Sequence, residues 1–175
     1  MTKLLSIILL SFILLISCDN QKKDTKDKYL ALSKEERYEI SQNSLKESMK
    51  KEQAQISSYI KRKGGTFTES ATGVHYFIYK NEQNGKVAKN GQLAQIRYTL
   101  TLLKGDTIQT NKTEHFVVDF EQKESGLHEC IKQLTIGDKA IIIIPSYMAH
   151  GLTGDDNKIP SLTSIVYNIE LLNLE

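Results

Sequence analysis

The chain has 175 residues, which suits one modest domain with accessory segments. Its 23 Lys and Arg residues and 21 Asp and Glu residues leave a formal net charge of +2, with both signs mixed along the chain. This balance argues against a nucleic-acid-binding surface and against a surface that charge alone would draw to a membrane.

The N-terminal segment has the pattern of a secretory signal. Lys3 precedes the uncharged stretch Leu4–Ile16, which is shorter than the roughly 20 apolar residues that a membrane-spanning helix needs. The stretch ends in Leu15-Ile16-Ser17-Cys18, which resembles the lipobox of bacterial lipoproteins. The resemblance implies a signal peptide over residues 1–17, lipid attachment at Cys18, and anchoring in the cell envelope outside the cytoplasm. An ordinary signal peptide and an uncleaved signal anchor are the alternatives.

A tether is predicted after the anchor. Asp19–Lys28 contains no apolar residue and carries both signs of charge, so we expect a flexible, solvated segment from Cys18 to residue 32. If Cys18 carries lipid, Cys130 has no partner within the chain, and a disulfide framework is excluded. Cys130 is then either a buried small apolar residue or a reactive thiol.

A long helix is predicted over residues 33–64. Ser33 and Glu36 have the spacing of a capping box. Residues 34–63 contain no Pro or Gly, and Gly64-Gly65 ends the segment. Its apolar residues lie on one stripe, which consists of Tyr38, Leu45, Met49, Ile56 and Ile60. Gln42 and Glu52 interrupt this stripe. The helix is either a spacer whose last turns pack on the next domain or a helix that forms a weak homodimer through residues 34–63.

The hydrophobic period changes to that of strands after Gly65. The predicted strands are Val74–Tyr79, Leu93–Leu103, Phe116–Phe120, Lys139–Pro145 and Ser164–Leu174, and Gly126–Leu134 reads as a short helix. Several strands with one short helix and no alternation of strands and helices predict an α+β domain with an antiparallel sheet.

Motifs in this half resemble a known family. They are Ile96-Arg97-Tyr98-Thr99, Lys104-Gly105-Asp106, Gly126-Leu127-His128-Glu129, Gln133-Leu134-Thr135-Ile136-Gly137-Asp138, Ile144-Pro145 with Ala149-His150-Gly151, Ile159-Pro160, and Ile165-Val166-Tyr167. In this order, residues 65–175 resemble the FK506-binding-protein type of peptidyl-prolyl cis-trans isomerase. The resemblance implies an antiparallel sheet wrapped around a short helix, and rotation of X–Pro bonds in proline-containing client proteins without a cofactor.

The resemblance also implies a cleft for the proline ring. The six positions that match the family's cleft are Tyr98, Ile108, Leu127, His150, Ile159 and Tyr167. Ile108-Gln109 stands where the family has phenylalanine and aspartate, Leu127 replaces a floor tryptophan, and His150 replaces a tyrosine that binds a ligand carbonyl. Lys123-Glu124 aligns with a valine-isoleucine pair whose backbone donates to the substrate.

These departures leave two functions open. One is an isomerase, and the other is a catalytically weak or inactive peptide-binding, chaperone or scaffolding domain, in which the two tyrosines are ordinary core residues. The order of lipobox, tether, helix and degenerate isomerase domain resembles lipoproteins associated with gliding motility, which implies clients that fold outside the cytoplasm. The four histidines lack metal-ligand spacing, and no nucleotide-binding motif is present, so we expect no metal or cofactor.

Overall fold

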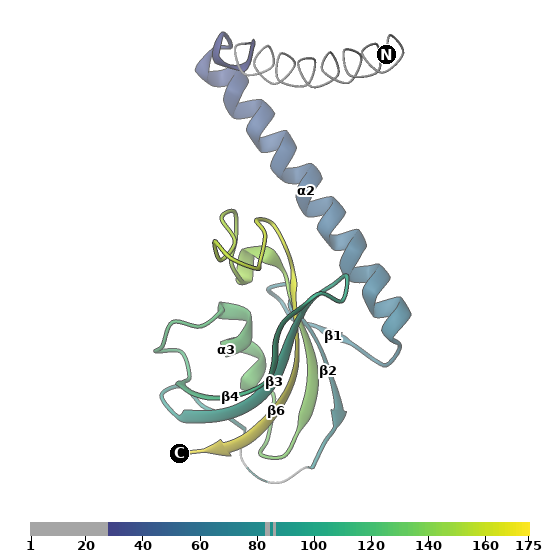
Figure 1. Ribbon diagram of the computed structural model, residues 1–175, viewed down its shortest axis with the longest axis vertical. Coiled ribbons are helices and arrows are strands. Elements are labelled where there is room, and N and C mark those ends of the chain that lie inside the picture. Colours follow the sequence, from purple (N-terminus) through teal and green to yellow (C-terminus); the bar gives the residue numbers. More distant parts are fainter. Residues whose placement is uncertain (1–27, 83–84, 86) are drawn as a thin grey trace, which may run out of the picture. The chain divides into compact units, whose positions relative to one another are not determined.

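The computed structural model describes residues 28–82, 85 and 87–175 (Figure 1). The chain divides into two compact units, Met1–Glu47 and Ser48–Glu175. The predicted signal peptide, the lipid attachment at Cys18 and most of the tether lie outside the described residues. Residues 28–30 are helical, at the end of the segment predicted as tether. Within the described part of the chain, no helix combines the length and the apolar character that crossing a membrane requires.

The long helix predicted over residues 33–64 forms as α2 (Lys34–Lys63). Its start is the predicted capping box, because Glu36 N donates to Ser33 Oγ at 3.2 Å and Ser33 N donates to Glu36 Oε2 at 2.9 Å. Gly64 ends the helix with a φ of 69°, a conformation that glycine adopts without strain.

A six-stranded antiparallel sheet forms the centre of the second unit (Figure 1). Its strands, in spatial order, are β1 (Thr68–Glu69), β2 (His75–Lys80), β5 (Lys139–Ile144), β6 (Ile165–Leu174), β3 (Leu93–Leu102) and β4 (Thr107–Val117). The short helix α3 (Ser125–Ile131) packs its buried residues into the main core. The predicted α+β fold with an antiparallel sheet around a short helix is therefore confirmed.

Side chains that alternate along β5 pack into two different clusters, one on each face of the sheet. On β5, Ile142 and Ile144 belong to the main core with α3, whereas Ile141 and Ile143 belong to a second cluster with Ile56 of α2. Successive strand residues point to opposite faces, so α3 covers one face and the last turns of α2 cover the other. This explains why β5 reads in the sequence as one uninterrupted apolar run.

The strand predicted at Phe116–Phe120 was misplaced. Strand β4 instead begins at Thr107 and ends at Val117, and Asp119 lies in a turn with a φ of 65°. β4 is an edge strand with mostly exposed, polar residues, so it lacks the apolar alternation by which a half-buried strand is recognised. The two-residue strand β1 and the 3-10 helix Ser146–Met148 were also missed, because both are too short to show a period.

A long connection between β5 and β6, here called the flap (residues 147–163), closes one end of the main core. Its conformation is fixed by backbone hydrogen bonds from Gly151 N to Ser146 O at 2.7 Å and from Leu162 N to Gly151 O at 2.9 Å. Ile159 is the flap residue that reaches the main core, where it is buried. The flap therefore carries two of the six predicted cleft residues, His150 and Ile159.

Candidate functional site

The predicted cleft residues converge from four elements and the flap. Tyr98 lies on β3, Ile108 on β4, Leu127 on α3, Tyr167 on β6, and Ile159 in the flap, and all belong to the main core or pack against it. The rings of Tyr98 and Tyr167 pack with their centroids 5.0 Å apart. Leu127, Tyr167, Ile159 and Tyr98 are only 0%, 2%, 3% and 6% exposed, so the apolar floor is covered.

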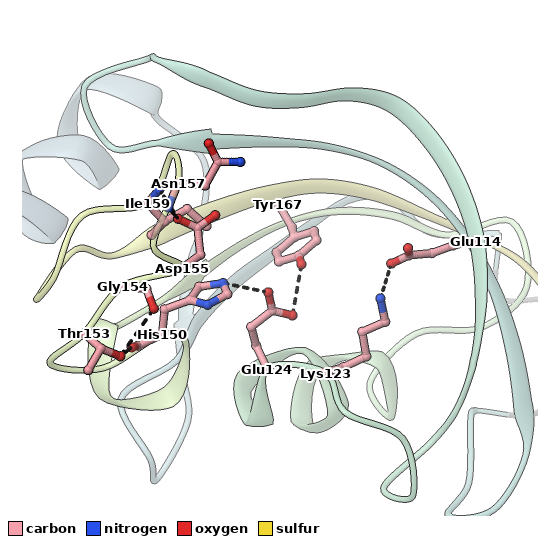
Figure 2. A network of polar contacts seen from close by, with 10 residues as sticks. All are labelled: Glu114, Lys123, Glu124, His150, Thr153, Gly154, Asp155, Asn157, Ile159 and Tyr167. Atoms are coloured by element: carbon pink, nitrogen blue, oxygen red, sulfur yellow. Dashed lines mark hydrogen bonds and ion pairs between the residues drawn. The ribbon is translucent and has the colours of Figure 1, made fainter.

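Glu124 lies between Tyr167 and the sixth predicted residue, His150 (Figure 2). Tyr167 Oη donates to Glu124 Oε2 at 3.1 Å, and His150 Nε2 lies 3.3 Å from Glu124 Oε1. Glu124 is the N-cap residue of α3, but its side chain makes no capping hydrogen bond. The carboxylate is therefore directed into the site and not onto the helix terminus.

The hydroxyl of Tyr167 stays protonated in this arrangement. Burial raises the pKa of Tyr167 well above its ordinary value, and the negative charge of Glu124 raises it further. The hydroxyl thus acts as the donor to the carboxylate. His150 forms an ion pair with the same carboxylate only when its imidazole is protonated. Its Nε2 therefore faces Glu124, where the family resemblance predicted a donor to a ligand carbonyl.

A second acidic residue, Glu114, lies beside Tyr98. Lys112 Nζ and Lys123 Nζ lie 2.8 Å and 2.7 Å from its two carboxylate oxygens. Burial alone would raise the pKa of Glu114, but hydrogen bonds and charge from the two lysines outweigh it and hold the pKa below its ordinary value. Burial, with Glu114 nearby, raises the pKa of Tyr98 to about 12. The surroundings of Tyr98 are therefore charged on the side of Glu114, whereas Leu127, Ile159 and Tyr167 are buried in the core.

The flap holds Ile159 in place through Asp155 (Figure 2). Asp155 Oδ1 accepts from Ile159 N at 2.6 Å and from Asn157 N at 3.0 Å. The hydrogen bond from Ile159 N lowers the pKa of Asp155. Gly154 has a φ of 77°, and a Cβ at this position would lie 2.2 Å from Ile159 O. The acidic loop that includes Asp155 is thus a turn that orients Ile159 toward the core.

Metal and covalent chemistry find no matching constellation in the described part of the chain. No group of three or more His, Cys, Asp or Glu side chains is placed there to hold a metal ion. Cys130 is buried on α3, and burial raises the pKa of its thiol to about 12. The arrangement can therefore offer an apolar floor, aromatic walls and a charged rim to a bound peptide.

The family model described as FKBP-type peptidyl-prolyl cis-trans isomerase matches residues 85–172. The chain belongs to this family. The match covers strands β3 to β5, helix α3, the flap and most of β6, which together supply all six predicted cleft residues. Strands β1 and β2 lie before the matched residues.

Relatives and solved structures agree with this assignment. Peptidyl-prolyl cis-trans isomerase FKBP9 of Rattus norvegicus is 29% identical over 100 residues, which are 55% of this chain and 18% of FKBP9. FK506-binding protein 2 of Dictyostelium discoideum is 26% identical over 100 residues, or 75% of that protein. The chain thus spans less than a fifth of rat FKBP9, a much longer protein.

Two bacterial structures share the fold. A peptidyl-prolyl cis-trans isomerase from Pseudomonas syringae pv. tomato superposes with a TM-score of 0.65 at 21% identity, covering 74% of this chain and 95% of that one. FkpA from Escherichia coli superposes with a TM-score of 0.60 at 21% identity, covering 90% of this chain and 81% of that one. The FKBP-like fold is therefore found in bacterial proteins.

The sequence did not predict the two acidic side chains of this FKBP-type cleft. Glu124 was aligned with a family residue that acts through its backbone, and Glu114 was not singled out. Residue 109, where the family has an aspartate, is a glutamine here and is exposed on β4. Glu114 on the same strand places an acid beside Tyr98 instead. The signal available in the sequence was an acidic residue directly before the short helix that forms the floor.

Proposed function

We propose that this protein is a peptidyl-prolyl cis-trans isomerase whose active site is the cleft formed by the six predicted residues. The observation that carries the proposal is that Tyr98, Leu127, Ile159 and Tyr167 share the main core, with the rings of Tyr98 and Tyr167 packed together, in a chain of the FKBP family. These residues lie on two separate strands, a helix and the flap, and the family resemblance predicts that they line one cleft.

The chemistry needs no nucleophile. Resonance sets a barrier of about 18–20 kcal/mol to rotation about a peptide bond, whereas the cis and trans forms of an X–Pro bond are close in energy. An apolar floor of Leu127 and Ile159 would take the proline ring and remove water from the amide, which disfavours the charge-separated planar form. Contacts with the Tyr98 and Tyr167 rings that fit the twisted amide better than the planar one would lower the barrier further.

The site is covered in the described conformation, so peptide binding requires the rim to move. Glu124 and His150 are the residues to move, because their side chains, at 12% and 28% exposed, are more accessible than Tyr167, which is 2% exposed. A bound peptide carbonyl would then compete with Glu124 for the hydroxyl of Tyr167. This competition would make the protein a slower isomerase than one with an apolar rim.

The cellular setting belongs to the same proposal. The lipobox at Cys18 supports a lipid-anchored protein in the bacterial cell envelope, and the clients would be extracytoplasmic proteins whose folding is limited by slow proline isomerisation. Membership of the gliding-motility-associated group and a weak homodimer through residues 34–63 stay predictions from the sequence. Metabolic labelling with a palmitate analogue, compared between the natural chain and Cys18→Ser, tests the anchor.

A catalytically weak or inactive peptide-binding module is the second candidate. The observation that favours it is the carboxylate of Glu124 between Tyr167 and His150, because a charged group there works against the exclusion of water from the amide. Such a module would bind extended, proline-containing segments in the same cleft. It would protect unfolded clients without accelerating the cis-trans step.

A protease-coupled isomerisation assay on residues 19–175 separates the two candidates. Succinyl tetrapeptides with leucine or phenylalanine before proline would be the substrates, and Tyr98→Ala and Ile159→Ala the test variants. Ile141→Ala is the matched control, since Ile141 is 4% exposed against 3% for Ile159 but packs on the opposite face of the sheet. It controls for the cost of removing a buried isoleucine side chain.

An isomerase at this site predicts acceleration above background that falls at least about tenfold in both test variants, or about 1.4 kcal/mol of transition-state stabilisation. The Ile141→Ala variant should retain the activity at a temperature where it is folded. Folded natural protein without acceleration of either peptide, but with measurable peptide binding, would refute the isomerase and support the binding module.

A further inference from the structure

Glu52 of α2 is a buried acidic residue that the cleft described so far does not include. In the sequence, Glu52 interrupts the apolar stripe of the helix. In the structure, Glu52 is only 7% exposed, and Ile56 one turn later is fully buried. A buried carboxylate is unfavourable unless hydrogen bonds compensate for the lost water. The contacts of Glu52 therefore identify what this position does.

Two serines supply those hydrogen bonds. Glu52 Oε1 accepts from Ser146 N at 2.7 Å and from Ser164 Oγ at 2.5 Å, and Glu52 Oε2 accepts from Ser146 Oγ at 3.0 Å. Both serines are 2% exposed. A carboxylate is suited to this task because it only accepts, and its two oxygens satisfy three donors at once.

The two serines are the residues on either side of the flap (147–163). The antiparallel ladder between β5 and β6 ends at the pair Ile144 and Ile165, so Ser146 and Ser164 lie just beyond the last paired residues. Glu52 continues the connection between the two strands where their own pairing stops. Both ends of the flap are thereby fastened to the same carboxylate of α2.

The flap supplies two of the cleft residues, His150 and Ile159. The turn that carries His150 starts from Ser146, whose carbonyl accepts from Ala149 N at 3.0 Å and from Gly151 N at 2.7 Å. Ser146 N and Oγ bind Glu52. A shift of Ser146 would therefore move the turn that places His150 against Glu124.

We propose that Glu52 is a positioning residue of the cleft, which makes the last turns of α2 a working part of the site and not only a spacer. Its carboxylate holds the two ends of the flap in register, so that Ile159 and His150 face the floor formed by Leu127 and Tyr167. The part of this inference that concerns catalysis rests on the proposed isomerase function, whereas the fastening of the flap is independent of it.

The test compares three variants of the full chain, purified in detergent. Glu52→Ala removes both acceptor oxygens, and Glu52→Gln keeps one of them. Ile56→Ala is the control, because it weakens the packing of the same helix on Ile141, Ile143 and Val166 without touching the serines. The readouts are amide hydrogen exchange of residues 147–163 against that of β3, the binding of a proline-containing tetrapeptide, and kcat and KM separately.

Glu52→Ala should raise hydrogen exchange in the flap at least about tenfold, because hydrogen bonds to a charged group are lost, while exchange in β3 changes little. It should raise KM or the peptide Kd about fivefold with kcat changed less than about twofold, because a displaced flap would lose contacts to the peptide in the ground state and the transition state alike. Glu52→Gln should give intermediate values, and Ile56→Ala should leave flap exchange and KM within about twofold of the natural chain.

Two results would overturn the inference. One is flap exchange and peptide affinity within twofold of the natural chain in Glu52→Ala. The other is an equal loss in Ile56→Ala, which would assign the effect to helix docking in general. If the natural chain does not isomerise the tetrapeptide, the proposed function fails, but flap exchange and peptide binding measured on the same samples still decide the role of Glu52.

Discussion

The hydrogen bond between Tyr167 and Glu124 is the contact that most distinguishes this cleft, and a double-mutant cycle measures it. Tyr167→Phe removes the donor and keeps the aromatic wall, while Glu124→Gln removes the charge and keeps the shape. The bond joins a residue that is 2% exposed to a carboxylate whose side chain is 12% exposed. Water can therefore reach the acceptor only in part once the donor is gone.

The magnitude follows from these exposures. A hydrogen bond to a charged group contributes about 1.5–3 kcal/mol, and partial access of water to Glu124 places Tyr167→Phe near the lower end, at about 1.5 kcal/mol. The coupling energy between the two changes should be about 1 kcal/mol. Isomerase activity of Tyr167→Phe should stay within about threefold of the natural chain, because the aromatic ring remains and the hydroxyl that is lost is already engaged by Glu124.

Urea unfolding followed by far-ultraviolet circular dichroism is the assay, since the chain has no tryptophan. Tyr147→Phe is the matched control, because its hydroxyl donates to the neutral carbonyl of Thr72 and the residue is 54% exposed, so its removal should cost less than about 0.5 kcal/mol. A coupling energy below about 0.3 kcal/mol between Tyr167→Phe and Glu124→Gln would refute the assigned bond, because that value is no larger than the ordinary error of additivity.

Three further outcomes follow from the site and the core. Gly154→Ala should lower kcat/KM about tenfold, because the new Cβ would displace Ile159. Gly105 also has a positive φ, of 104°, but has open space around an added Cβ, so Gly105→Ala should not lower kcat/KM. Equal effects of the two substitutions would contradict the proposed clash. Cys130 in residues 19–175 should react with a thiol reagent at pH 8 at least about a thousandfold more slowly in the folded state than in urea, and rapid native reaction would show that α3 is not packed as described. Folding raises the pKa of Tyr98 from its ordinary value to about 12, so the stability that the protonated hydroxyl contributes should be fully present below pH 10 and decline as the pH rises toward about 12. A urea midpoint that rises between pH 10 and pH 11 would contradict this prediction.

The order of elements could be predicted from the sequence because each has a local cause. The capping box of α2, the glycine at its end and the buried apolar run of β5 are set by neighbouring residues, and all three appear as expected. Strand β4 shows the limit of this reasoning. It is formed by pairing of polar residues with β3 at the edge of the sheet, so its position depends on a partner and not on its own pattern.

The roles of the three acidic residues near the cleft were decided by tertiary structure alone. In the sequence, Glu52 interrupts an apolar stripe, Glu114 lies on a polar stretch, and Glu124 precedes a helix, and each reads as a solvated side chain. Folding brings Glu52 to two serines that are 94 and 112 residues away, and Glu124 to Tyr167, 43 residues away. Hydrogen bonds of this kind stabilise a buried carboxylate only when distant donors are placed around it, so no local pattern in the chain records them.

The sequence by itself indicated the family, the helix and most strands, because these follow from motif order, capping and local period, and it predicts the six cleft residues. The tertiary structure decided that Leu127, Tyr167 and Ile159 form a covered floor, that Glu124 lies between Tyr167 and His150, and that α2 reaches the flap through Glu52. The physical reason is that burial and charge pairing depend on which distant segments meet, whereas secondary structure depends largely on residues a few positions apart.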